Sequence, residues 1–234
     1  MTSPSTAQRM DPTKPRPGWV ELSVGLAIMA LIAFVLAPQL GRLGMSDPTA
    51  GIVGGVVSGG GGLLAFAAAA LVRRRSWEAF GVRRTTVRWL LIGLAAGLVA
   101  FAARVVAVYL VTLIIDVETD TQASYAAGAG AGLVSLALMM LTLAVLTPIG
   151  EEFLFRGVVT SALLRYGALV GVVGSAVVFA LMHGINEVLP AAVIVGLIAG
   201  ELYRRSGSIW PGVLMHALYN AITLALLALA ASAT

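Results

Sequence analysis

LVSLALMMLTLAVLTPIGEEFLFRGVVTSALL, residues 133–164, is the stretch that decides the fold. As a helix it would extend about 48 Å at 1.5 Å per residue, longer than the ~30 Å hydrocarbon core of a bilayer. Pro148 and Gly150 lie near its middle, so we expect a kink or a break there. The stretch predicts a membrane helix that carries two glutamates and an arginine at membrane depth.

The whole chain has the composition of a protein that faces lipid. Apolar residues make up 59% of it and charged residues 11%, and the mean hydropathy is +0.96. Soluble domains carry roughly 25% charged residues, because their surfaces face water. We therefore predict an all-α, polytopic membrane helical bundle of about seven transmembrane helices, whose other apolar runs are Trp19–Leu40, Ala50–Val72, Trp89–Ile115, Ala168–His183, Val188–Tyr203 and Ser208–Ala231. Gly59–Gly62 in the second run predicts close helix packing or a local distortion of the helix.

Basic residues indicate how the helices cross the membrane. Residues 1–18 are polar and proline-rich, which predicts a disordered cytoplasmic tail. With the N-terminus in the cytoplasm and seven spans, every basic residue except Arg42 and Arg104 belongs to an inner segment. The outer loop near residues 116–120 instead carries three acidic residues. This asymmetry agrees with the positive-inside rule, and it attributes the high pI to cytoplasmic loops, so no nucleic-acid partner is expected.

Ionisable side chains at membrane depth cost free energy, so each indicates a function or a specific partner. Glu151 and Glu152 are adjacent and point about 100° apart on a helix, so we expect that they cannot both face one partner. Glu152 and Arg156 are four residues apart, the spacing of a helical ion pair. That pair would leave Glu151 unpaired, in an apolar setting suited to a general base.

Both histidines of the chain lie in predicted spans. His183 ends Phe179-Ala-Leu-Met-His183, and His216 precedes Asn220 by one helical turn, so the last two share a helix face. Counted from the inner interface, Glu151, His183 and His216 lie about 21, 22 and 16 Å along their helices. We therefore expect these side chains to meet at one depth. Chance packing accounts poorly for such a convergence.

The motifs Glu151-Glu152-x-x-x-Arg156, Phe179-x-x-x-His183 and His216-x-x-x-Asn220 occur together in this order. Over roughly residues 133–225 the chain resembles the CPBP family, which includes the type II CAAX prenyl endopeptidases (Rce1-like). The resemblance implies an intramembrane glutamic endopeptidase whose site opens towards the cytoplasm. It also implies a division into the tail 1–18, accessory helices 19–115 and a catalytic core 116–234.

Specific roles follow from the resemblance. It implies that Glu151 activates water, that His183 helps to hold this water, and that His216 and Asn220 stabilise the oxyanion. Glu152, Arg156 and Phe179 would support these groups from behind. From the residues alone, Arg104 would either pair with a carboxylate or carbonyl, or bind the C-terminus of a substrate.

Several alternatives to a metal-independent protease remain open. Glu151, His183 and His216 also form a His₂Glu donor set for catalytic zinc, although no HExxH helix is present. A non-catalytic bacteriocin-immunity or scaffold protein, and a small-solute transporter, are further possibilities. For the protease we expect no cofactor, a peptide or protein substrate in or at the membrane, no nucleic acid, and a multi-pass location in the inner (plasma) membrane. The sequence contains no cysteine, which excludes disulfides and thiolate ligands.

Overall fold

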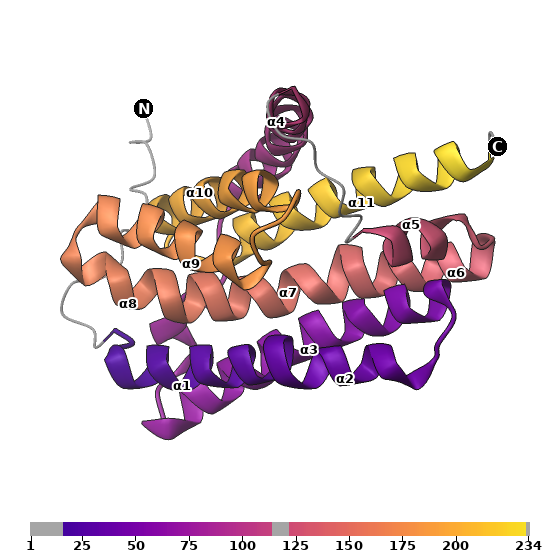
Figure 1. Cartoon of the computed structure of the whole chain (residues 1–234). Coiled ribbons are helices and arrows are strands. Elements are labelled where there is room, and N and C mark those ends of the chain that lie inside the picture. Colours follow the sequence, from indigo (N-terminus) through magenta and orange to yellow (C-terminus); the bar gives the residue numbers. More distant parts are fainter. Residues whose placement is uncertain (1–15, 114–121, 233–234) are drawn as a thin grey trace, which may run out of the picture.

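A computed structural model describes residues 16–113 and 122–232, and these form an all-helical bundle (Figure 1). Residues 1–15 of the predicted tail 1–18 and the acidic loop near 116–120 lie outside the described residues. Within them, five helices are long and apolar enough to cross a membrane: Trp19–Leu43, Asp47–Val72, Val87–Leu110, Leu133–Tyr166 and Trp210–Ser232. The chain is therefore a multi-pass membrane protein.

Each predicted apolar run is largely helical over its described residues. The helices are α1 (Trp19–Ala30) with α2 (Ala37–Leu40), α3 (Asp47–Val72), α4 (Val87–Thr112), α5 (Ala123–Gly130), α6 (Leu133–Met139), α7 (Thr147–Glu152), α8 (Ser161–Leu163), α9 (Ser175–Met182), α10 (Leu189–Ser206) and α11 (Trp210–Ser232). Two apolar helices do not qualify as membrane spans. The stretch Val170–Met182, which includes α9, is too short, and α10 carries three charged residues near its end. The count of about seven spans stays a prediction.

The long run 133–166 does not break at Pro148. It continues as one helix from α6 to α8, with π-helical turns at Met140–Leu146 and Phe153–Thr160 on either side of α7. The sequence predicted a kink or a break. A break is absent, and the distortion takes the form of a π turn that rearranges the hydrogen bonding just before the proline, which has no N–H to donate. Glu151 and Glu152 consequently lie in a short α-helical segment between two π turns.

Glycines bring α3 and α7 into backbone contact. A Cβ atom added at Gly62 would lie 2.5 Å from the carbonyl oxygen of Gly150, and one at Gly59 would lie 2.6 Å from that of Leu146. Such closeness is possible because Gly59 and Gly62 of α3 carry no side chains, which confirms the predicted close packing of this glycine segment. It places Ser58 of α3 directly beside Glu151 of α7.

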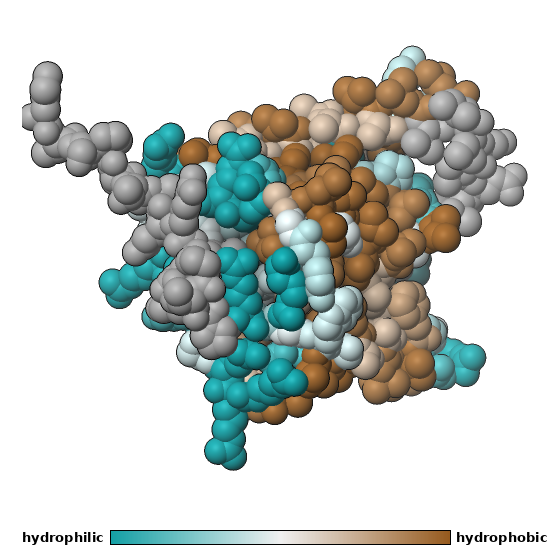
Figure 2. All heavy atoms as spheres, turned by 90° about the vertical axis from the view of Figure 1, so that its left-hand side faces the viewer, coloured by the Kyte–Doolittle hydropathy of each residue, from teal (hydrophilic) through white to brown (hydrophobic). Residues whose placement is uncertain are grey.

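The two ends of the bundle differ in charge. At the end where α1 begins, Arg75 pairs with Glu21, Arg165 donates to the carbonyl of Pro17, and Arg83 donates to that of Gly207. Figure 2 shows hydrophilic side chains gathered on this end, with apolar side chains along the flanks. We call it the arginine end. The opposite end holds α5 and the C-terminal end of α11 (Figure 1).

Candidate active site

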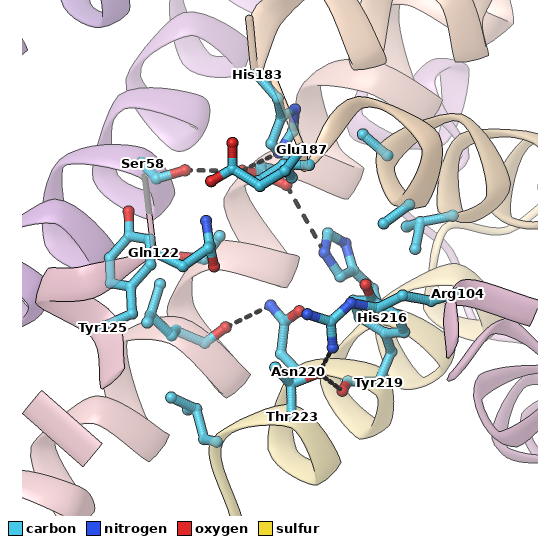
Figure 3. Close-up of a pocket in the computed structure, with 18 of the residues that line it drawn as sticks. Ser58, Arg104, Gln122, Tyr125, His183, Glu187, His216, Tyr219, Asn220 and Thr223 are labelled. Atoms are coloured by element: carbon cyan, nitrogen blue, oxygen red, sulfur yellow. Dashed lines mark hydrogen bonds and ion pairs between the residues drawn. The ribbon is translucent and has the colours of Figure 1, made fainter. Parts of the chain in front are cut away.

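A cavity of about 410 Å³ lies among α3, α4, α5, α7, α9, α10 and α11. Every residue that the sequence predicted to be catalytic lines it, namely Glu151, His183, His216 and Asn220. Figure 3 shows the histidines and Asn220 turned towards the same space. Three helices that are distant in the sequence therefore bring these polar groups to one depth, as their positions predicted.

Glu151 lies at the centre of the polar groups and is only 4% exposed. Its Oε1 accepts a hydrogen bond of 2.7 Å from the hydroxyl of Ser58. The Nε2 atom of His183 is 4.0 Å from Oε1, and the Nε2 atom of His216 is 3.8 Å from Oε2. Both separations exceed a direct hydrogen bond and suit groups that share one small polar molecule between them.

The ring of His183 has a defined orientation. Its Nδ1 is 2.9 Å from the carbonyl oxygen of Phe179, one turn earlier on α9. A carbonyl only accepts, so Nδ1 donates, and Nε2 is the nitrogen that faces Glu151. The Phe179 ring packs 4.6 Å from the His183 ring, measured between centroids. The motif Phe-x-x-x-His thus orients the imidazole through its backbone as well as its ring.

His216 lies between the two glutamates. Its Nδ1 is 3.3 Å from Oε1 of Glu152, while its Nε2 faces Glu151. The expectation that adjacent carboxylates cannot face one partner was wrong, because an imidazole has nitrogens on two edges and each glutamate approaches a different one. Glu152 therefore contacts the imidazole of His216 directly and fixes which of its nitrogens faces Glu151.

The second carboxylate oxygen of Glu152 faces a buried cation, Arg156. Arg156 Nε is 3.1 Å from Glu152 Oε2, and both side chains are 0% exposed, which confirms the predicted i,i+4 pair. The Arg156 guanidinium also lies over the ring of Phe179, with Cζ 4.8 Å from the ring centroid. Arg156 thus contacts both a glutamate and the aromatic residue that orients His183.

Asn220 and Arg104 line the part of the cavity beyond His216 (Figure 3). The Asn220 carboxamide donates a 2.7 Å hydrogen bond to the carbonyl of Leu143, in the π turn before Pro148. Arg104 donates to the hydroxyl of Thr223 at 3.3 Å and lies over the ring of Tyr219. The contacts described for Arg104 are thus a hydroxyl and an aromatic ring, and its carboxylate or carbonyl partner stays a prediction.

Sequence reasoning missed several lining residues that carry no motif. Ser58 and Thr147 bond α3 and α7 together, the latter through the carbonyl of Gly55 at 3.0 Å. Tyr125 on α5 also lines the cavity, and its pKa is raised by burial and by the negative charge of Glu151. A serine in a glycine-rich apolar helix is a weak signal, because such residues commonly serve only packing.

The described residues contain no group of three His, Cys, Asp or Glu side chains arranged to hold a metal ion. Zinc donors lie about 2.0–2.2 Å from the metal, so two donors of a tetrahedral site are separated by little more than 3 Å. The nitrogen–oxygen separations around Glu151 are longer than this, at 3.8 and 4.0 Å. A zinc ion would therefore require these side chains to move closer together.

A comparison with protein families identifies the part of the chain that holds these motifs. Residues 133–222 match the model of the family described as type II CAAX prenyl endopeptidase Rce1-like. This segment is therefore a domain of that family, which is a family of peptide-bond hydrolases, and the buried Glu151, Glu152 and His216 are consistent with its catalytic site. No curated protein and no solved structure matches the chain.

Proposed function

We propose that this protein is an intramembrane endopeptidase that uses Glu151 to activate water, without a metal. The observation that carries the proposal is the convergence of the Nε2 atoms of two histidines on one buried carboxylate, at 4.0 and 3.8 Å. The Rce1-like domain supports peptide hydrolysis as the reaction class. A protein that only packs helices has no need for three ionisable groups around a cavity.

The proposed reaction begins with a water molecule held by Glu151 and His183. Glu151 removes one proton from this water as the oxygen attacks the carbonyl carbon of the peptide bond. The carbonyl oxygen becomes an oxyanion, which His216 and Asn220 stabilise, an effect worth about 3–4 kcal/mol per donor. Glu151 then returns the proton to the leaving nitrogen, so that the carbon–nitrogen bond breaks and a carboxylic acid and an amine are formed.

The supporting residues keep this arrangement in place. Glu152 and Arg156 hold His216 from behind, and Phe179 accepts the hydrogen bond that orients His183. Ser58 holds one oxygen of Glu151, which leaves the other towards His216. None of these groups needs to exchange protons with the substrate, so we assign them a positioning role.

The substrates proposed for this site are membrane-associated or lipid-modified peptides, which reach a cavity enclosed by apolar helices. Arg104 would bind an anionic group of the substrate, such as a C-terminal carboxylate, because a guanidinium forms strong hydrogen bonds with carboxylates. The protein would lie in the inner (plasma) membrane with its N-terminus and arginine end in the cytoplasm. This orientation agrees with the position of Arg75, Arg83 and Arg165 at one end of the bundle.

The proposal is tested by comparing the membrane peptides of cells that carry the wild-type protein with those of cells that carry Glu151→Gln. Glutamine is nearly the same size but cannot accept the proton, so peptides processed by this enzyme should remain uncleaved. Equal amounts of the two proteins in the membrane are the control for folding. Identical peptide profiles with equal protein levels would refute the proteolytic function.

Zinc-dependent proteolysis is the alternative mechanism, and a chelator distinguishes it from metal-independent proteolysis. A strong chelator should leave the cleavage rate unchanged if Glu151 activates water by itself. Loss of activity on chelation, with recovery on addition of Zn²⁺, would instead support a His₂Glu zinc site.

A further inference from the structure

Six arginines lie in the connection between α3 and α4 and in the first turn of α4, within residues 73–88. Two of them are bonded within the protein: Arg75 pairs with Glu21, and Arg83 donates to the carbonyl of Gly207. The other four are exposed, namely Arg73, Arg74, Arg84 and Arg88. Within residues 16–113 and 122–232, no acidic side chain forms an ion pair with any of these four. They therefore present their positive charges to a partner outside the chain.

Hydrogen bonds and packing hold this connection in a fixed position. The hydroxyl of Ser208 donates to the carbonyl of Arg83 at 2.8 Å, and the side chain of Arg83 donates to the carbonyl of Gly207 at 2.7 Å. Phe80 is 0% exposed and packs against Phe66 of α3, with 5.2 Å between ring centroids. The exposed arginines therefore lie on an ordered surface that is bonded to the turn between α10 and α11.

The four exposed arginines flank the ends of two membrane helices. The helix α3, which is long and apolar enough to cross a membrane, ends at Val72, and the equally apolar stretch of α4 begins at Val87. Leu71 and Val87 are 71% and 70% exposed, as expected of side chains that face lipid tails. Trp77 in the connection is 60% exposed, and tryptophan favours the interface between membrane and water. The guanidinium groups are therefore expected at the depth of the lipid headgroups.

From these observations we infer that the surface formed by residues 73–88, which we call the basic surface, binds the phosphate headgroups of anionic phospholipids in the surrounding bilayer. A guanidinium group can form two parallel hydrogen bonds with a phosphate, and every basic residue of this segment is an arginine. Clusters of basic residues beside a membrane helix attract anionic lipids, because the charges lie close enough to escape screening by salt. The inference depends neither on the proposed proteolysis nor on which membrane surface the arginine end faces.

Two double variants that remove equal charge test the lipid site. Arg84→Gln with Arg88→Gln changes the basic surface, whereas the control, Arg204→Gln with Arg205→Gln, removes two arginines that are paired with Glu201. Each full-length protein is placed in detergent micelles that hold equal amounts of phosphatidylglycerol and phosphatidylcholine, and the bound lipids are counted by native mass spectrometry. Wild type and control should prefer phosphatidylglycerol about tenfold, and the variant of the basic surface should lose most of this preference.

A further double variant, Arg84→Lys with Arg88→Lys, keeps the charges but loses the parallel hydrogen bonds, so its preference should lie between those of wild type and the glutamine variant. An equal loss in the glutamine variant and the control would show a general effect of charge and overturn the inference, as would equal binding of the two lipids by the wild type. Displacement of phosphatidylglycerol by inorganic phosphate at constant ionic strength would overturn it in favour of a site for free phosphate. The Tm should be unchanged in the lysine variant, which separates lost lipid binding from misfolding.

Discussion

The arginine end of this bundle and the half that contains the cavity, which we call the cavity half, use charged side chains in different ways. At the arginine end, several charges meet opposite charges or backbone carbonyls, as in the pairs of Arg75 with Glu21 and of Arg204 with Glu201. In the cavity half, Glu151 meets a hydroxyl and two imidazoles, and Arg104 meets a hydroxyl and an aromatic ring. Charges of the first kind stabilise and orient the protein, while those of the second kind remain able to interact with a substrate.

The pair Glu152–Arg156 forms the boundary between the two regions, and its disruption should have the largest effect on stability. Glu152→Gln leaves the guanidinium buried without a counter-charge, which costs about 3–5 kcal/mol. Thermal unfolding in detergent should show a large drop in Tm for this variant and little change for Glu151→Gln. In the cleavage assay the order should reverse, with Glu151→Gln losing more activity.

This matched pair of variants also tests the division of labour between the adjacent carboxylates. Glutamine at 152 still offers an oxygen to Nδ1 of His216, so the imidazole keeps a partner. Equal losses of kcat in the two variants, at equal amounts of folded protein, would contradict the assignment of Glu151 as the base and Glu152 as a positioning residue.

Arg104 tests whether the cavity half binds an anionic part of the substrate. A hydrogen bond to a charged group contributes about 1.5–3 kcal/mol, so Arg104→Gln should raise KM roughly 10- to 100-fold. The value of kcat should change little, because this contact is made equally in the ground state and in the transition state. An amidated peptide substrate should lose the difference between wild type and variant. A fall in kcat alone would contradict substrate binding by Arg104.

Ser58 tests whether α3, which lies outside the Rce1-like segment, contributes to the site. Removal of its hydrogen bond to Glu151 in Ser58→Ala should lower kcat about tenfold, because that bond contributes about 1–1.5 kcal/mol to the positioning of the carboxylate. Ser58→Thr keeps the hydroxyl and should restore most of the rate. If both variants are equally slow, the effect is one of helix packing and not of the hydrogen bond.

The smallest effect is expected for the ion pairs of Glu201 at the arginine end, which are partly exposed to water. Glu201 is paired with Arg204 and Arg205, and its carboxyl pKa of about 2 reflects hydrogen bonds from these arginines. Exposed pairs of this kind are screened by solvent and contribute less than about 1 kcal/mol. Glu201→Gln should therefore barely change Tm or the cleavage rate. A stability loss as large as that of Glu152→Gln would remove the contrast between buried and exposed pairs.

Much of the site could be predicted from the sequence, because the positions of its side chains depend on residue spacing along single helices. The i,i+4 relation predicted the pair Glu152–Arg156, and helical rise predicted that Glu151, His183 and His216 meet at one depth. Spacing along one helix carries no information about the opposite wall of a cavity. Ser58, Tyr125 and Thr223 therefore became visible as lining residues only in three dimensions.

The amino-acid sequence by itself determined that the chain is a helical membrane protein, which end of it is basic, and which motifs carry its chemistry. Composition and helical periodicity suffice for these conclusions, because lipid requires apolar surfaces and internally bonded backbones. Only the tertiary structure decided that both glutamates contact one imidazole and that residues of α3, α4, α5, α7, α9, α10 and α11 line one cavity. Those features depend on how helices that are distant in the sequence pack together, and on how far the short helices extend between them.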